Sequence, residues 1–150
     1  MFKKTLLVIS LCIIAMTGVY AQTSKVSPDE VGAEWQPYLE NDKVLVEVKK
    51  SDCIFKSDGI AQRWILFRFT NKTSAAVQLN YEYDLYYNEI CKTCGSDEYY
   101  TTISMAPKEV IEGECNIQNN RYYKYAMVEF LDMKRNKKLT GFHLNNLSVK

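Results

Sequence analysis

The sequence has few of the residues from which most active sites are built. It contains one histidine, His143, in 150 residues, so a Ser-His-Asp triad would have to use that side chain. No Gly-x-Ser-x-Gly nucleophile elbow accompanies it, and the sequence has neither a glycine-rich phosphate loop nor an EF-hand pattern. A lone histidine specifies little, and we interpret His143 as a surface or hydrogen-bonded residue of a strand. The sequence therefore predicts a protein that is not an enzyme and binds no metal or other cofactor.

The sequence also lacks an excess of charge of one sign. Lysine and arginine number 19, aspartate and glutamate 18, and the formal net charge is +1. Without Lys3 and Lys4, which belong to the leader described next, that charge of +1 becomes −1. A near-neutral domain has no global electrostatic attraction for nucleic acid or for an acidic membrane. We therefore expect neither as a partner.

A long hydrophobic run is present only at the N-terminus. Lys3 and Lys4 precede an apolar run over residues 6–15, and Val19-Tyr20-Ala21 has small residues where a signal peptidase reads them. The run is too short to span a bilayer comfortably, and no later segment replaces it. The alternative interpretation of this apolar run is a membrane anchor that is not cleaved. We predict a signal peptide over residues 1–21, export to the periplasm or the cell exterior, and no stable membrane insertion.

Beyond residue 43 the apolar residues recur with a period close to two, which is typical of half-buried strands. Turn signals separate the apolar segments at roughly ten-residue spacing, as in a two-sheet antiparallel sandwich. Residues 22–43 form a lead-in, in which Ser27-Pro28-Asp29-Glu30 has the form of a capping box that starts a short helix. The sequence therefore predicts an all-β sandwich domain over residues 44–150, with seven strands near 44–49, 64–69, 77–85, 100–105, 110–115, 122–131 and 139–149.

Three stretches of this sequence resemble a known group of proteins. They are VEVKKSDC, ILFRFTNKTSAAVQLNYEYDLYYNEICKTC and MAPKEVIEGEC, within roughly residues 35–150. They are similar to small exported proteins of Bacteroidetes-type bacteria, most of them uncharacterised, that have a single immunoglobulin-like or fibronectin-III-like sandwich. The resemblance implies a seven-stranded antiparallel immunoglobulin-like fold and an exported location. It implies no activity, cofactor or catalytic residue.

Four cysteines follow the predicted leader: Cys53, Cys91, Cys94 and Cys115. An even number of cysteines in an exported chain indicates two disulfides, and three pairings are possible. A bridge between Cys53 and Cys115 would close a loop of about sixty residues and stabilise the fold by roughly 4 kcal/mol. The spacing alone does not choose among the three pairings.

The Cys-x-x-Cys pair at Cys91 and Cys94 has three interpretations. A redox centre requires a thiolate stabilised by a helix N-terminus or by cations, whereas Glu89, Asp97 and Glu98 flank this pair and acidic neighbours raise a thiol pKa. A four-cysteine zinc site usually contains two such pairs, and only one is present. A structural disulfide in a cross-linked loop fits an exported protein best.

Two pairs of acidic residues have the spacing of acid–base catalysts. Glu82 and Asp84, like Glu112 and Glu114, lie two positions apart and so share one face of a strand. Glycoside hydrolysis would need the two carboxyl groups at about 5 to 10 Å across a sugar cleft. We interpret both pairs instead as residues of solvated strand faces.

Tyrosine is the most prominent remaining feature, and the chain contains 11. Adjacent tyrosines on a strand cannot both point inward, so one of each doublet should be exposed, where it offers rigid amphipathic contact area. Cross-strand aromatic pairing that strengthens the sheets is the alternative. The contact surface that we predict comprises Tyr99, Tyr100, Tyr122 and Tyr123.

These observations predict an exported, non-catalytic binding module. Its partner would be a protein or a glycan of the cell envelope or the extracellular space. The alternative function is thiol–disulfide exchange at Cys91 and Cys94.

Overall fold

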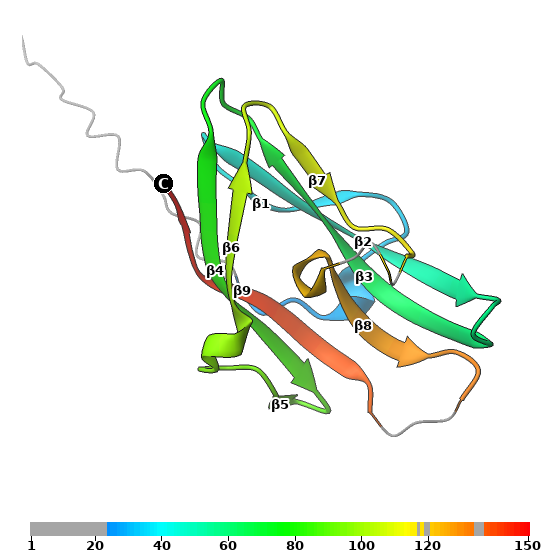
Figure 1. Cartoon of the computed structure of the whole chain (residues 1–150). Helices are drawn as coiled ribbons and strands as arrows, with labels where there is room; N and C mark the ends of the chain where they lie inside the picture. The colour runs from blue at the N-terminus through cyan, green and yellow to red at the C-terminus, as the bar shows by residue number, and fades with distance from the viewer. Residues whose placement is uncertain (1–23, 117, 119–120, 134–136) are drawn as a thin grey trace, which may run out of the picture.

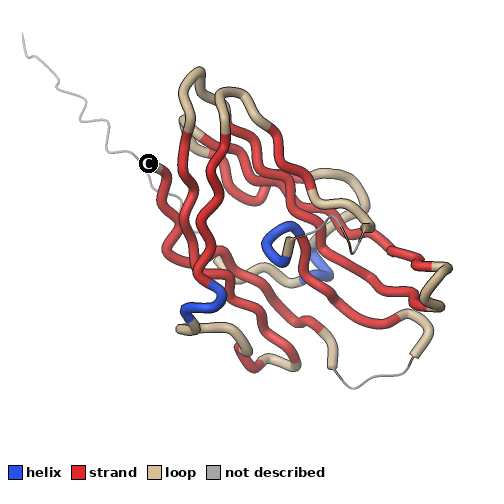
Figure 2. Tube along the Cα trace, viewed as in Figure 1, coloured by secondary structure: helices blue, strands red, loops and turns tan. Residues whose placement is uncertain are grey.

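A computed structural model of the chain describes residues 24–116, 118, 121–133 and 137–150. The predicted signal peptide, residues 1–21, lies outside the described residues. In the described part the chain forms two antiparallel sheets that pack against each other as a β-sandwich, with three short 3₁₀ turns (Figures 1 and 2). No helix there is long and apolar enough to cross a membrane.

Nine strands make up the two sheets. The five-stranded sheet contains β1 (Gln36–Glu40), β2 (Val44–Phe55), β3 (Ile60–Asn71), β7 (Val110–Glu112) and β8 (Tyr125–Phe130). The four-stranded sheet contains β4 (Val77–Tyr87), β5 (Ile90–Cys91), β6 (Tyr100–Met105) and β9 (Leu139–Val149). The 3₁₀ turns are η1 (Pro28–Glu30), η2 (Asp97–Tyr99) and η3 (Tyr122–Lys124).

Two long strands, β3 and β4, form the centre of the two layers. On one side β3 pairs with β2 along its whole length, and on the other side it pairs with β7 near Thr70 and with β8 between Gln62 and Leu66. The partner of β4 on one side is β9, while β6 and then the short β5 share its other side. Each layer therefore has one edge divided between two short strands (Figure 1).

The core lies between the two layers and is rich in aromatic side chains. Phe67 packs edge-on against Tyr83 and Phe142, with ring centroids 5.6 and 5.4 Å apart. Phe69 instead stacks on Tyr81 across the interface, with ring centroids 6.2 Å apart. These five side chains are almost completely buried, and burying one such side chain contributes roughly 1.5–3 kcal/mol. The alternating pattern of the sequence therefore produces the core directly, because every second residue of each strand faces it.

Each of the seven predicted strand segments contains a strand, and the structure adds β1 and β5. Cys53 was expected after the first strand, but it lies within β2, which continues to Phe55. Cys115 was expected at the end of a strand, but β7 ends at Glu112. The capping box of the lead-in is present at Ser27, although it starts only a single 3₁₀ turn. The lead-in also contributes β1, which pairs with β2.

One buried polar residue joins two turns at the end of the sandwich where the chain passes from β3 to β4. The Asn71 amide donates hydrogen bonds to the carbonyls of Ala75 and Ala106, both at 2.8 Å. Its oxygen accepts bonds from the backbone N–H and the hydroxyl of Thr73. Because Asn71 is fully buried, these bonds are shielded from water and hold both turns in place.

Candidate functional site

The four cysteines form two disulfides of very different span. Cys53 is bonded to Cys115 across 62 positions, and Cys91 to Cys94 across three. In the chain-entropy treatment the long loop contributes about 4 kcal/mol and the short loop only about 1.5 kcal/mol. The long bridge therefore accounts for most of the disulfide stabilisation, and the short bridge is a local constraint.

The Cys91–Cys94 loop folds back along the edge of β4 beyond the start of β6, beside η2 and β5 (Figure 1). The buried Thr93 hydroxyl donates to the carbonyl of Tyr83 at 2.6 Å and accepts from the backbone N–H of Leu85 at 2.7 Å. Within the loop, the backbone N–H of Cys94 donates to the Cys91 sulfur at 3.0 Å. Cys94 is exposed and Cys91 is half-buried, so solvent reaches the bridge mainly at Cys94.

A buried carboxyl group lies beside this bridge. Asp84 is only 3% exposed, and one of its oxygens and the sulfurs of Cys91 and Cys94 all lie within 4.8 Å of one another. Its Oδ1 has no hydrogen-bond partner among the described residues, while Oδ2 lies 3.9 Å from Nδ1 of His143 on β9. Burial raises the pKa of Asp84, and the neighbouring His143 opposes that rise.

The interpretation of Asp84 as a residue of a solvated strand face is therefore wrong. The cause is non-local: Asp84 points away from the core, as the alternation predicted, but it is still buried, with the Cys91–Cys94 loop and His143 beside it. Glu82, on the same face, stays partly exposed and accepts a hydrogen bond from Asn146. As long as the disulfide is intact, its two sulfurs are bonded to each other, so the cluster offers no thiolate to a metal ion.

An aromatic cleft lies where the edge strand β8 faces β4 of the other sheet. Its volume is about 380 Å³. The hydroxyls of Tyr83 and Tyr87 on β4 reach across and donate to the carbonyls of Tyr125 and Met127 on β8, at 3.1 and 2.8 Å. These bonds satisfy carbonyls at the open edge of β8, which would otherwise be available to another strand. The lining consists of Gln62, Trp64, Tyr83, Leu85, Tyr87, Tyr99, Tyr122, Tyr125, Ala126 and Met127.

Ring contacts fix the walls of this aromatic cleft. Trp64 stacks on Tyr125 with ring centroids 4.2 Å apart. Tyr99 meets Tyr122 edge to face at 6.3 Å, and the Thr101 hydroxyl donates to the Tyr122 hydroxyl at 3.3 Å. Tyr122 is 47% exposed, so it forms the accessible rim, whereas Trp64 forms the buried floor.

Comparison of the chain with protein-family models, with curated proteins and with solved structures found no match. The likeness to exported sandwich proteins therefore stays a prediction. Function has to be inferred from the aromatic cleft and from the cluster of Asp84, Cys91 and Cys94.

The structure brings together only part of the predicted tyrosine surface. Tyr99 and Tyr122 line the aromatic cleft. Tyr100 is 53% exposed on β6 but does not line it, and Tyr123 packs against Phe69 of the core. Sequence reasoning selected two of the three tyrosine doublets and so missed other tyrosines of the cleft. The missed lining tyrosines are Tyr83, Tyr87 and Tyr125.

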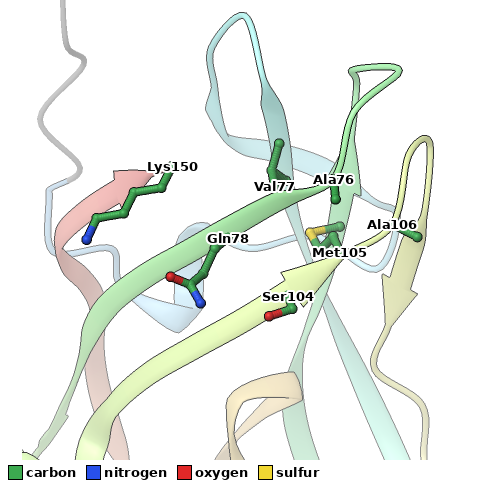
Figure 3. A pocket seen from close by; sticks show the side chains of 7 residues that line it. All are labelled: Ala76, Val77, Gln78, Ser104, Met105, Ala106 and Lys150. Carbon is green, nitrogen blue, oxygen red and sulfur yellow. The ribbon is translucent and has the colours of Figure 1, made fainter.

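A second hollow, of about 470 Å³, lies at the opposite end of β4 (Figure 3). Its lining comes from the start of β4, the end of β6 and the last residue, Lys150. The Lys150 side chain extends away from Met105 and Ala106 (Figure 3). The hollow has no convergent set of polar groups, which a specific small-molecule site requires, and we assign it no role.

Proposed function

We propose that the protein is an exported binding module whose aromatic cleft takes an apolar or aromatic side chain of a protein partner. The observation that carries this proposal is the cavity of about 380 Å³ walled by aromatic residues of both sheets. Aromatic walls bury large apolar area and fix ring geometry, which is typical of the pockets that anchor protein partners. The exposed rim at Tyr122 leaves the cavity open to such a side chain.

A protein partner suits this aromatic cleft better than a glycan. Sugar recognition needs polar groups that are ready to bond to hydroxyls, besides an aromatic platform. The Gln62 side-chain oxygen already accepts a bond from the Trp64 indole at 2.8 Å. The hydroxyls of Tyr83 and Tyr87 are donated to β8. The cleft is thus mainly an apolar receptor, and glycan binding is the outcome that would count against our assignment.

We also infer that the sandwich is immunoglobulin-like and that the protein is exported. The chain runs from β2 and β3 in one sheet to β4 and β6 in the other, returns for β7 and β8, and crosses again to β9. Such repeated crossing between antiparallel sheets is typical of Greek-key sandwiches. Two disulfides are typical of oxidising compartments and support export. Mass spectrometry of the mature protein tests the leader, and a chain that begins at Gln22 is expected.

Site-specific photo-crosslinking tests the proposed binding. A photoreactive phenylalanine analogue replaces Tyr122 at the cleft rim or, as a matched control, Val110 on β7. The two positions are 47% and 52% exposed, and β7 pairs with the opposite end of β3 from the cleft. The tagged variants are irradiated in cells that produce them, and adducts are identified by mass spectrometry.

We expect one protein adduct from position 122 that is not formed from position 110. Added 4-cresol, a mimic of the tyrosine side chain, should suppress this adduct. Equal adducts from both positions would contradict the proposal. So would a glycan array on which binding disappears when Tyr122 is changed to alanine.

A further inference from the structure

We propose that the Cys91–Cys94 disulfide is redox-active and that Asp84 is its acid–base group. The bridge would accept two electrons from a dithiol of a partner protein, and the buried carboxyl would supply the proton that the leaving sulfur needs. This activity is separate from binding in the aromatic cleft and does not depend on it.

The two sulfurs are placed for different tasks. Cys94 is exposed, so an incoming thiolate meets its sulfur first. Cys91 is half-buried, and its sulfur accepts the backbone N–H of Cys94 at 3.0 Å. A hydrogen bond to sulfur stabilises the thiolate, and a more stable thiolate leaves faster. Cys91 is therefore the leaving sulfur.

The exchange conserves atoms and electrons. A partner thiolate attacks the sulfur of Cys94, the Cys91–Cys94 bond breaks, and a mixed disulfide forms between the partner and Cys94. Cys91 leaves as a thiolate and takes the proton of Asp84. The second thiolate of the partner then attacks the partner's own sulfur in the mixed disulfide and releases Cys94, which takes a proton from water. The partner ends as a disulfide and this chain as a dithiol.

Asp84 has the position and the surroundings for this proton transfer. Its carboxyl oxygen lies within 4.8 Å of both sulfurs, and Oδ1 has no other partner among the described residues. Burial raises its pKa, so the carboxyl holds a proton to higher pH than an exposed aspartate does. A proton donor of higher pKa is better matched to exchange near neutral pH.

The polar and titratable groups that act on Asp84 lie on β9 and β4. His143 and Asn145 on β9 favour the ionised form of Asp84, and Glu82 on β4 disfavours it. The Tyr86 hydroxyl lies 3.7 Å from the Cys94 sulfur. Two further charges lie on the loop after β4 and on the N-terminal segment, in the ion pair of Glu89 with Lys25 at 2.7 Å.

The ion pair of Glu89 with Lys25 weakens one argument against a redox-active bridge, namely that acidic neighbours raise the pKa of its thiols. Glu89 was one of three acidic neighbours expected to oppose thiolate formation. Lys25 compensates its charge and also lies 4.6 Å above the Tyr86 ring. The electrostatic penalty at the bridge is therefore smaller than the sequence suggests.

The second disulfide provides an internal control in the same molecule. Cys115 is exposed, as Cys94 is, and Cys53 is buried beside Trp64 and Leu66. Their bridge belongs to no comparable cluster of acidic, histidine or cysteine side chains among the described residues. The experiment is a time course of reduction of the full mature chain by dithiothreitol between pH 3 and 9. Alkylation and mass spectrometry report the reduction of each bridge separately. Each reduction rate is divided by the concentration of dithiothreitol thiolate at that pH.

We expect the Cys91–Cys94 bridge to be reduced at least tenfold faster than Cys53–Cys115. Its reduction rate, divided by the concentration of dithiothreitol thiolate, should fall as the pH rises through the pKa of Asp84. In Asp84→Asn the rate should drop about tenfold at low pH and lose this inflection. Asp84→Glu should keep the inflection, and the matched control Glu82→Gln should leave the profile essentially unchanged.

His143→Gln separates the effect of the histidine from that of Asp84. Without the histidine, the inflection should move to higher pH, because a charge that favours the carboxylate is gone. Loss of the inflection in His143→Gln together with its survival in Asp84→Asn would overturn the proposal. Equal reduction rates for the two bridges of the wild-type protein, or a wild-type profile without inflection, would also overturn it, and these two results need no variant to fold.

Discussion

The two disulfides should differ sharply in what they contribute to stability. The perturbation compares two double variants, Cys53→Ala with Cys115→Ala and Cys91→Ala with Cys94→Ala. Since the bridges span 62 and three positions, the loop-closure entropy predicts losses of about 4 and about 1.5 kcal/mol. Cys53 is also buried in a small apolar cluster, so removing its sulfur adds roughly 1 kcal/mol for lost contacts.

Equilibrium urea unfolding, followed by tryptophan fluorescence and by far-ultraviolet circular dichroism, measures both losses. The variant without the long bridge should also show a larger dependence of the unfolding free energy on urea concentration, because its unfolded chain is less compact. In thermal unfolding its midpoint should fall by about 10 °C or more. The variant without the short bridge should stay within a few degrees of the wild type.

Equal losses in the two double variants would refute this reasoning. A larger loss from the short bridge would refute it more strongly. Either result would mean that local packing around Cys91 and Cys94, rather than loop closure, governs the stability of the fold.

Three further predictions concern single residues. Asn71→Ala should lower the unfolding free energy by about 3 kcal/mol in urea titrations, because the four buried hydrogen bonds that its amide group makes are lost. Gly113→Ala should cost about 2 kcal/mol in the same assay, since its new Cβ would lie 2.2 Å from the backbone oxygen of Lys124. Burial raises the pKa of Tyr87 to about 12. The stability that this group contributes should be present below pH 10 and lost as the pH rises through 12, roughly 3 kcal/mol in total. Urea unfolding at alkaline pH checks this loss, which Tyr87→Phe should abolish.

The strands could be predicted because local alternation records which residues face a core. Val44, Val46 and Val48 alternate with partly buried residues of β2 as their spacing indicated. Tyr81 and Tyr83 likewise point inward from β4. A period of two needs no knowledge of the partner strand, so the all-β sandwich follows from the sequence.

The sites could not be predicted in the same way, because each depends on a segment distant in the sequence. The burial of Asp84 depends on the loop that folds back beside it and on His143 from β9. The aromatic cleft depends on Tyr83 and Tyr87 reaching β8, about forty positions further along the chain. The disulfide pairing depends on β2 and the segment after β7 lying side by side. Alternation shows which face a residue occupies but not what covers that face.

Methyl NMR of the methionine-labelled protein tests most directly whether the aromatic cleft is a binding site. Met127 lines the cleft, Met105 lines the hollow at the other end of β4, and Met133 is exposed on the surface. During titration with 4-cresol, we predict a saturable shift of the Met127 signal and essentially unchanged signals from the other two. An unmoved Met127 signal, or equal and non-saturating shifts of all three, would contradict the assignment of the cleft as a receptor for an aromatic side chain.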